Sequence, residues 1–245
     1  MSRLIAVIQA RTGSTRLPRK VLRDLGGRPV LAWVVGAARL SGVCDEIVVA
    51  TTTDAGDDEV AALAMQLDAK VVRGPVDDVL TRFLLAAEAV GADDRDAIIR
   101  LTADCPLLDP HIVALCGQRF VPGRLDYVTT DHDATVAHGF DVEVVSVAAL
   151  RRIDPLARGA DRAHVTSYIA FRPDEFRTAT VALDPASVDL RITLDEPADA
   201  ELLDAIVAEL GDDARDWRSV VTLLRARPDL VAINADVDVK PIAAG

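Results

Sequence analysis

Short apolar, β-branched runs alternate with stretches of helical periodicity over residues 1–120. The runs LIAVIQ, EIVVATTT, AKVVRG and AIIRLTAD are typical of buried strands, and a helical stretch follows each of them. The last of these stretches, PHIVALCGQRF, has a proline at its start, where a helix tolerates it. This order predicts an α/β fold with a mostly parallel sheet flanked by helices on both faces.

The pattern changes after Phe120. LDYVTT, GFDVEVVSVAAL and FRTATVAL are strand-like but irregularly connected, which predicts antiparallel or mixed strands in an excursion at about residues 121–185 that could mediate dimerisation. The segment RITLDEPADAELLDAIVAEL predicts a strand followed by a capped helix, and DWRSVVTLLRARPDL predicts a final helix. Because the sequence has no repeat, low-complexity run or long linker, residues 1–245 are predicted to form a single domain.

The composition narrows the possible partners and compartment. A net charge of −12 argues against nonspecific binding to nucleic acid or to an anionic membrane. No apolar run approaches the roughly 20 residues that span a bilayer, and the N-terminus does not read as a signal peptide, so we expect a cytoplasmic protein. The three cysteines lack CxxC spacing and the four histidines lack i, i+4 pairing, which predicts neither a disulfide framework nor a histidine-rich metal site.

One loop concentrates positive charge in this acidic chain. Directly after LIAVIQ, four arginines and one lysine lie between Arg11 and Arg23. The small residues Thr12, Gly13 and Ser14 would let backbone N–H groups approach an anion, and this combination suits a polyphosphate. The spacings of the P-loop and of G-x-G-x-x-G are absent. We favour an anion site over the alternative, a solvated basic loop before a helix.

Two aspartates follow predicted strands. Asp104 comes directly after AIIRLTA, and Asp195 follows RITL. Because ligands bind beyond the carboxyl ends of parallel strands, both carboxylates and the basic loop would converge on one edge of the sheet. Two aspartates placed there could share Mg²⁺ beside phosphates. An Asx-turn or a helix cap explains Asp104 equally well, and a helix cap explains Asp195 better when it is taken alone.

Three further segments give weaker signals. Arg73 and Arg82 in VVRGPVDDVLTRF could bind phosphates or a base edge, although surface salt bridges are the stronger interpretation. Asp141 in HGFDVEVV could bind a sugar hydroxyl or shape a turn. Arg162 and His164 lie in RAHVTSYI, and a lone histidine is more often packed or exposed than catalytic. None of these residues reveals a function by spacing alone.

Together these motifs resemble the sugar-acid cytidylyltransferases, which include the CMP-3-deoxy-manno-octulosonate and CMP-N-acylneuraminate synthetases. The likeness is greatest to the branch named for spore coat polysaccharide biosynthesis protein F. It spans about residues 3–205 and rests on AVIQARTGSTRLPRKVL and TADCPL, supported by VVRGPVDDVLTRF, GFDVEVVSVAAL, RAHVTSYI and RITLDEPAD. The resemblance implies a nucleotide-diphosphosugar-transferase-like, Rossmann-like fold and a homodimer. It also implies transfer of a cytidylyl group from CTP to a small anionic acceptor, with Mg²⁺ as cofactor and release of pyrophosphate.

The same resemblance implies roles position by position. Lys20 and Arg11 would be catalytic, with Lys20 neutralising charge at the α-phosphate. Asp104 and Asp195 would hold Mg²⁺. The acceptor would face Asp141, Arg162 and His164. Nucleotide binding would involve Arg11, Thr12, Gly13, Ser14, Arg16, Lys20, Arg73, Thr102 and Ala103.

Three positions depart from the family pattern. Ala163 stands where the branch has glutamate, Arg19 stands where glycine is usual, and Ala103 stands where glycine is common. Because Ala163 lies in the implied acceptor region, the acceptor could differ from a standard sugar acid and could be a phosphonate. A glycosyltransferase of the related fold and a catalytically inactive nucleotide-binding protein are the alternatives. The single aspartate of TADCP argues against the first, and the retained Lys20 argues against the second.

Overall fold

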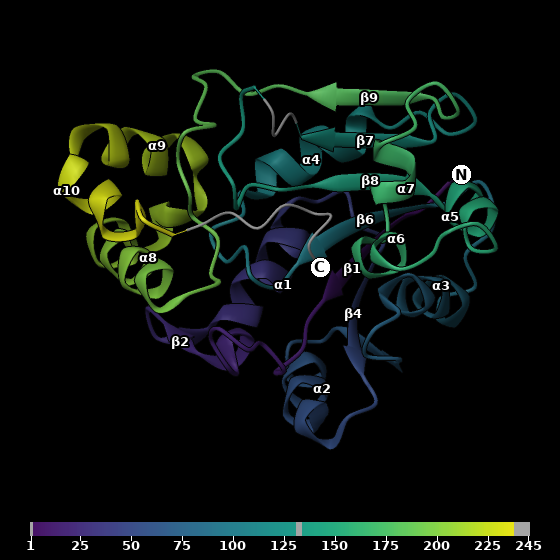
Figure 1. The fold of residues 1–245 in the computed structure, drawn as a ribbon, viewed down its shortest axis with the longest axis horizontal. Helices are drawn as coiled ribbons and strands as arrows, with labels where there is room; N and C mark the ends of the chain where they lie inside the picture. Colours follow the sequence, from purple (N-terminus) through teal and green to yellow (C-terminus); the bar gives the residue numbers. More distant parts are fainter. Residues whose placement is uncertain (1, 131–133, 238–245) are drawn as a thin grey trace.

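A seven-stranded sheet organises the computed structural model, which describes residues 2–130 and 134–237. The strand order is β5-β4-β1-β6-β8-β7-β9 (Figure 1). The strands are β1 (Leu4–Gln9), β4 (Glu46–Thr52), β5 (Lys70–Gly74), β6 (Ala97–Thr102), β7 (Tyr127–Thr130), β8 (Glu143–Ser146) and β9 (Thr178–Val181). A separate antiparallel pair consists of β2 (Asp24–Leu25) and β3 (Arg28–Pro29).

Most strands of the sheet run in one direction. β1 pairs in parallel with β4 and β6, and β4 pairs in parallel with β5. β8 is antiparallel to β6 and β7, whereas β9 is parallel to β7. β8 therefore runs against the other strands, whose carboxyl ends share one edge. The predicted mostly parallel, mixed sheet is confirmed.

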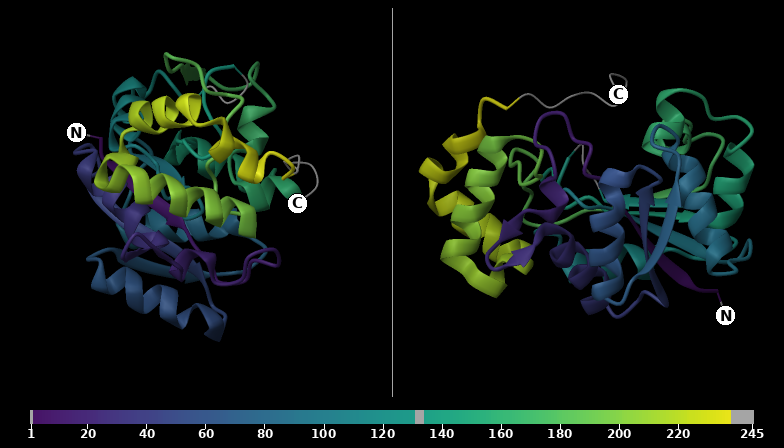
Figure 2. Two further views of the ribbon diagram at one scale, coloured as in Figure 1. Left: turned by 90° about the vertical axis from the view of Figure 1, so that its left-hand side faces the viewer. Right: turned by 90° about the horizontal axis from the view of Figure 1, so that it is seen from below.

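Helices cover both faces of this sheet, as predicted (Figure 2). Side chains of β1 alternate between two buried clusters: Ala6 and Ile8 belong to the first, and Ile5 and Val7 to the second. The first cluster includes side chains of α1 (Val30–Leu40), α2 (Asp58–Gln66) and α4 (Pro110–Arg119). The second includes those of α3 (Val79–Ala89), α5 (Val147–Ile153) and α7 (Ser167–Ala170). The two-residue period of the strand therefore decides which helices cover which face.

Two strand predictions are wrong in detail. The end of GFDVEVVSVAAL is not strand but α5, because the Ser146 hydroxyl accepts a hydrogen bond from the Ala149 N–H at 3.0 Å and caps a helix there. The segment RITL forms no ladder and makes one isolated bridge, between Arg191 and His138. Its Leu194 N–H instead donates to the Asp104 carbonyl at 2.7 Å. RITL is therefore an extended connection that docks beside the end of β6.

The remaining helices follow the sequence pattern, except that the single final helix predicted for DWRSVVTLLRARPDL is two helices, interrupted before Pro228. α8 (Pro197–Leu210) begins with the expected cap, a capping box of Glu196 and Asp199. It lies with α9 (Trp217–Ala226) and α10 (Pro228–Val231) at the left of Figure 1. The other short helical segments are α6 (Ala160–His164), η1 (Lys20–Leu22), η2 (Ala55–Asp57), η3 (Gly211–Arg215) and η4 (Ala232–Asn234).

The cysteines are free thiols, as expected. Cys105 and Cys116 are buried and Cys44 is partly buried. Within residues 2–130 and 134–237, no helix combines the length and the apolar character needed to cross a membrane.

Candidate functional site

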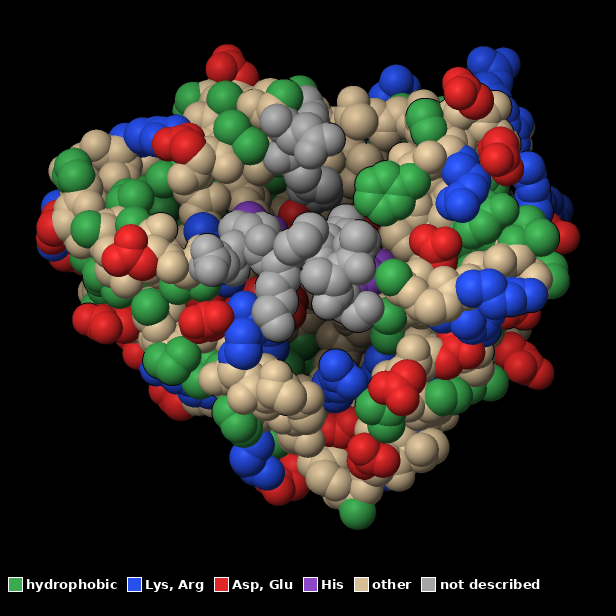
Figure 3. All heavy atoms as spheres, viewed as in Figure 1, with side chains coloured by type: hydrophobic (Ala, Val, Ile, Leu, Met, Phe, Trp, Pro, Cys, Tyr) green, Lys and Arg blue, Asp and Glu red, His purple; other side chains and the backbone are tan. Residues whose placement is uncertain are grey.

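A cleft of about 700 Å³ opens at the carboxyl ends of β1 and β6. In Figure 3, Lys and Arg side chains lie on either side of a hollow near the middle of the face shown. The cleft brings together most of the residues that the sequence predicts for the site. Those that line it are Arg11, Gly13, Ser14, Arg16, Lys20, Thr102, Ala103, Asp104, His164 and Asp195.

The basic loop is held in shape by Thr12. The backbone N–H and the hydroxyl of Thr12 both donate to Asp57 Oδ1 at 2.7 Å. The carbonyl of Thr12 accepts from the N–H groups of Ser14 at 2.8 Å and Arg19 at 3.0 Å. Thr12 is not among the residues that line the cleft, so its role in the structure is to anchor the loop beside α2.

Two positions in this loop have distinct backbone requirements. A Cβ added at Gly13 would meet no heavy atom within 4 Å, so the space in front of this backbone is open to a ligand. Arg19 has a φ of 60°, in the left-handed region that favours glycine. Its guanidinium turns away from the cleft and donates to both carboxylate oxygens of Glu59, at 3.0 and 2.6 Å. This positive φ explains why the family pattern has a glycine where this chain has Arg19.

Lys20 joins the two aspartates at one end of the cleft. Its Nζ lies 3.0 Å from Asp104 Oδ2 and 2.8 Å from Asp195 Oδ1. Burial disfavours the charge of Lys20, but the two carboxylates outweigh burial and raise the pKa of the ammonium. Burial also opposes ionisation of Asp104, yet Lys20 and hydrogen bonding from Thr102 together outweigh burial and hold the pKa of this carboxyl at about 2. Lys20 and Asp104 are therefore both charged at neutral pH.

The neighbouring arginines differ in their pairing. Arg16 lies 3.4 Å from Asp195 Oδ1 and 3.1 Å from Glu196 Oε1. We call Arg16, Lys20, Asp104 and Asp195 the carboxylate end of the cleft. Arg11 lines the cleft without an ion pair to any residue in the described part of the chain. Its charge is available to an anionic ligand.

The carboxylate end fits a divalent cation that also binds phosphate. Asp104 and Asp195 converge on one cationic group, the Lys20 ammonium, and both offer hard oxygen donors. Residues 2–130 and 134–237 contain no cluster of three or more His, Cys, Asp or Glu side chains that could hold a metal alone. Mg²⁺ is commonly bound by one or two carboxylates together with substrate phosphates, so two aspartates suffice here.

Two arginines that the sequence predicts for the site, Arg73 and Arg162, lie outside the lining of the cleft. Arg73 donates to the Thr52 carbonyl at 2.7 Å and to Asp58 at 2.6 Å, and it ties the end of β5 to the segment after β4. Arg162 lies 2.7 Å from Asp78 and 3.1 Å from Asp154. Neither guanidinium lines the cleft.

Asp141 also lies outside the cleft lining. Its Oδ2 accepts from the Gly139 N–H at 2.8 Å and lies 3.5 Å from His138 Nδ1. The bond to Gly139 is the local turn contact that the sequence offered as the alternative for this aspartate.

His164 lies in the cleft wall beside a buried polar cluster. Glu143 accepts hydrogen bonds from Arg100, Tyr127 and Thr166, the last at 2.6 Å. Burial and the nearby Arg100 guanidinium lower the pKa of His164, so its imidazole is neutral at pH 7. Its Nε2 is buried and has no hydrogen-bond partner among the described residues. That nitrogen is therefore free to bond a ligand.

Arg82, for which the sequence favoured a surface salt bridge, is buried instead. The side chain comes from the first turn of α3, is 2% exposed, and lines the cleft. We call the lining residues that come from α3, from α6 and from the residues just before these helices the helical wall: Val76, Asp77, Val79, Arg82, Gly159, Ala163 and His164. The arginine was visible in VVRGPVDDVLTRF, but its burial follows from the packing of α3 against β4 and β1, which no local pattern announces.

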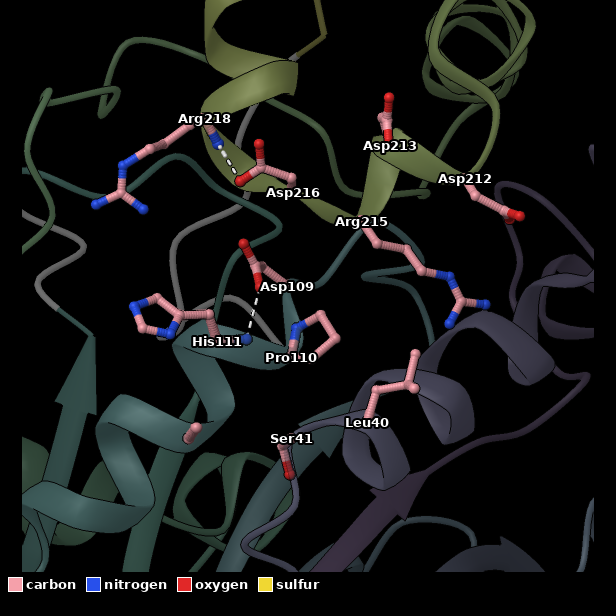
Figure 4. A pocket seen from close by; sticks show the side chains of 11 residues that line it. Leu40, Ser41, Asp109, Pro110, His111, Asp212, Asp213, Arg215, Asp216 and Arg218 are labelled. Atoms are coloured by element: carbon pink, nitrogen blue, oxygen red, sulfur yellow. Dashed lines mark hydrogen bonds between the residues drawn. The ribbon is translucent and has the colours of Figure 1, made fainter.

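A second hollow of about 680 Å³ lies between the starts of α4 and α9 (Figure 4). Two of its carboxylates, Asp109 and Asp216, already serve as helix caps, and a third, Asp212, forms an ion pair with Arg28. Asp109 accepts from the N–H groups of His111 at 2.6 Å and Trp217 at 2.9 Å, and Asp216 caps α9. None of the predicted site residues lines this hollow, so the cleft at the strand ends is the better candidate site.

Comparisons with known proteins identify relatives of this chain. The spore coat polysaccharide biosynthesis protein SpsF of Bacillus subtilis is 32% identical over 238 residues, which are 94% of this chain and 97% of that protein. The solved structure of a cytidylyltransferase from Leptospira borgpetersenii has a TM-score of 0.89 at 26% identity, and the match covers 98% of this chain and 100% of that chain. A CMP:2-keto-3-deoxy-manno-octonic acid synthetase complexed with CTP has a TM-score of 0.63 at 21% identity, covering 85% and 99% of the two chains, and shows the fold alone.

The family assignment rests on the match to a family model. The model of the cytidylyltransferases matches residues 5–197, a span that includes the basic loop and both aspartates of the carboxylate end. The chain therefore belongs to the cytidylyltransferase family and is a nucleotidyltransferase.

Proposed function

We propose that the protein transfers a cytidylyl group from CTP to an acidic sugar or a related anionic acceptor and releases pyrophosphate. The acceptor oxygen forms a bond to the α-phosphorus, the bond to the bridging oxygen breaks, and pyrophosphate leaves. The observation that carries this proposal is the position of Lys20, a buried cation facing two aspartates at the mouth of a basic loop. Nucleotidyl transfer depends mainly on positioning and on charge stabilisation, which such a group supplies.

The residues of the cleft would divide the work among them. Gly13, Ser14 and Arg16 would bind the triphosphate, as would Arg11, whose charge has no ion-pair partner in the described part of the chain. Lys20 would exchange its carboxylate partners for oxygens of the α-phosphate. Thr102 and Ala103 would line the nucleotide. Each of these side chains lines the cleft, which supports the assignment.

Asp104 and Asp195 would hold the divalent cation, and we assign it as Mg²⁺. When bound, the ion would supply Lewis-acid stabilisation of charge on the phosphates. His164 would face the acceptor, as a neutral hydrogen-bond partner rather than a cation, because its pKa is lowered. Arg73, Arg162 and Asp141 would act from outside the cleft, by holding the segments that carry its lining residues.

A homodimer is part of the proposal. The excursion at about residues 121–185 exposes large apolar side chains, with Phe171 65% exposed and Leu156 49% exposed. Covering them against a second copy would remove apolar surface from water. Light scattering on the purified protein would test this, since a monomeric mass at micromolar concentration would contradict it.

Pyrophosphate release tests the proposed reaction. Each of the four NTPs is incubated with Mg²⁺ and one member of a panel of sugar acids and small phosphonates. We expect release with CTP and at least one acceptor. Release with another NTP would keep the mechanism and overturn the cytidylyl assignment. Mg²⁺-dependent CTP binding without release for any acceptor would favour a catalytically inactive nucleotide-binding protein.

A further inference from the structure

Arg82 is a buried guanidinium without a carboxylate partner. One of its terminal nitrogens, Nη1, donates to the Ala50 carbonyl at 3.2 Å. Its Nε has no hydrogen-bond partner, and the side chain forms no ion pair, within residues 2–130 and 134–237. The residue is nonetheless 2% exposed and lines the cleft. Arg82 is thus a desolvated charge on the helical wall of the candidate site, with N–H donors that have no partner among the described residues.

Two other largely buried arginines of this protein are compensated by carboxylates, whereas Arg215, whose Nε also lacks a partner among the described residues, packs its guanidinium 4.8 Å from the centre of the Trp33 ring. Arg100 forms an ion pair with Glu143, and Arg191 lies 2.9 Å from Asp199 and 3.2 Å from Asp195. An uncompensated buried charge costs stability, and such groups are kept where a ligand completes the pairing. Burial and the Arg11 guanidinium lower the pKa of Arg82 to about 10, so it still carries its proton at pH 7. The Arg82 guanidinium can therefore donate hydrogen bonds to an acceptor that a ligand supplies.

We infer that Arg82 recognises the nucleobase of the nucleotide, by donating to the O2 and N3 atoms of cytosine. The inference rests on the proposed function and deepens it by naming a residue that selects CTP. A guanidinium presents parallel N–H donors in a fixed fork, and the adjacent O2 and N3 acceptors of cytosine match two of them. In uracil the N3 atom carries a proton, so the same fork would meet a donor and leave one N–H unpaired.

The surroundings of Arg82 favour a base over a phosphate. Most of the cleft's cations gather at the carboxylate end, where Lys20 and Arg16 face Asp104 and Asp195, and of the proposed triphosphate ligands only Arg11 lowers the pKa of Arg82. Arg82 belongs instead to the helical wall, where Val76 and Val79 line the cleft with it. Apolar side chains beside an oriented donor suit a flat base, whose faces are apolar and whose edge is polar. A phosphate would gain nothing from these valines.

Binding measurements on substitutions of Arg82 test this inference. The affinities of CTP, UTP and inorganic tripolyphosphate are measured by calorimetry with Mg²⁺, for the unmodified protein and for Arg82→Met and Arg82→Lys. We expect Arg82→Met to lose about 10- to 100-fold in CTP affinity, UTP to lose less and tripolyphosphate to change little, because CTP loses two hydrogen bonds to a charged group, UTP loses only the one to O2, and tripolyphosphate loses none. Arg82→Lys keeps the charge without the fork and should fall between.

The control is Arg225→Met, which removes an exposed arginine paired with Asp189 away from the cleft and should bind all three ligands unchanged. Equal losses for CTP, UTP and tripolyphosphate would overturn the inference and make Arg82 a phosphate ligand. An unchanged ratio of CTP to UTP affinity in a folded Arg82 variant would overturn it too. If the unmodified protein itself does not prefer CTP to UTP, the cytidylyl assignment fails, and that result is distinct from the other two.

Discussion

At the carboxylate end of the cleft, cations and carboxylates form ion pairs with one another. On the helical wall, two polar side chains have nitrogen atoms that lack such partners among the described residues. Lys20 faces Asp104 and Asp195 at 3.0 and 2.8 Å. Arg82 has no ion-pair partner, and the Nε2 atom of His164 has no hydrogen bond, in the parts of the chain that the structure describes. In our proposal, the charged groups of the carboxylate end would exchange their present ion pairs for contacts with the ligand. The unpaired groups of the helical wall would gain their first partners from the ligand.

This difference teaches where stability and selectivity reside in one cleft. Paired charges at the carboxylate end compensate one another in the folded protein, and in the proposed reaction they would exchange partners. Unpaired groups on the helical wall cost stability, and in our proposal they would gain partners only in the complex. Variants at the two regions should therefore change turnover, stability and substrate affinity in different proportions.

The largest effect is expected from Lys20→Met. Removing a preorganised charge at the reacting phosphate should lower kcat on the order of 100-fold or more. Steady-state pyrophosphate release would measure this, with Arg225→Met as the unaffected control. Turnover near that of the unmodified protein would remove Lys20 from the chemistry.

The stability of the same variant should separate the two regions. Lys20→Met leaves Asp104 and Asp195 facing each other without their cation, and we expect it to lower the free energy of unfolding by about 2–4 kcal/mol. Added Mg²⁺ should recover part of that loss by binding the two carboxylates. Arg82→Met removes an unpaired buried charge that costs stability, so it should leave the free energy of unfolding unchanged or raise it. Similar losses in urea unfolding for both variants would contradict the comparison.

Stability should also depend on pH through Asp104. The pKa of this carboxyl is about 2 in the folded protein, against an ordinary value of 3.8. The depressed pKa stabilises the fold by about 2 kcal/mol above pH 4, and this contribution is lost as pH falls toward 2. The free energy of unfolding should therefore differ less between the unmodified protein and Asp104→Asn at pH 3 than at pH 5. A difference that does not change with pH would argue against a depressed pKa.

His164→Ala should affect the acceptor rather than the nucleotide. Loss of one hydrogen bond from a neutral imidazole should raise the KM for the acceptor about threefold to tenfold, with the KM for CTP unchanged. Initial rates at varied acceptor and fixed CTP would show this. If the KM for CTP rises instead, His164 belongs to the nucleotide side of the cleft.

The smallest effect is expected at Arg19, outside both regions. Arg19→Gly relieves a left-handed backbone but loses an exposed ion pair with Glu59, and the two changes nearly cancel. We expect its Tm to lie within about 3 °C of the unmodified protein. Arg19→Ala loses the pair and keeps the backbone cost, so it should melt at a lower temperature than Arg19→Gly. A reversed order would mean that the φ of 60° carries no cost.

Much of the fold was predictable because it depends on local periodicity. The first four strands of the sheet along the chain, and the helices that follow them, lie where the sequence pattern places them. The strand prediction for RITL was wrong, because an apolar, β-branched run can be buried by hydrogen bonds to a strand end without joining a ladder. The strand prediction for VAAL was wrong because the Ser146 cap starts a helix there and competes with continuation of the strand.

The site was predictable to the extent that it follows strand ends. The basic loop and Asp104 could be placed at one edge from their positions after strands. Asp195 also reached that edge, although the strand expected before it does not form. The burial of Arg82 depends on how α3 packs, and the pairing of Arg73 and Arg162 depends on distant carboxylates. Such tertiary contacts cannot be predicted from the local sequence pattern.

The separation of Lys20 from Asp195 along the chain has a consequence for biosynthesis. The two residues are 175 positions apart, and the segment carrying Asp195 is held through Asp199, which binds Arg191 and Asn234. During translation the basic loop emerges long before its second counter-charge can dock. A ribosome-bound or prematurely terminated chain therefore displays the basic loop without the aspartate that completes the carboxylate end. The cleft gains its second aspartate only after every strand of the sheet has been made.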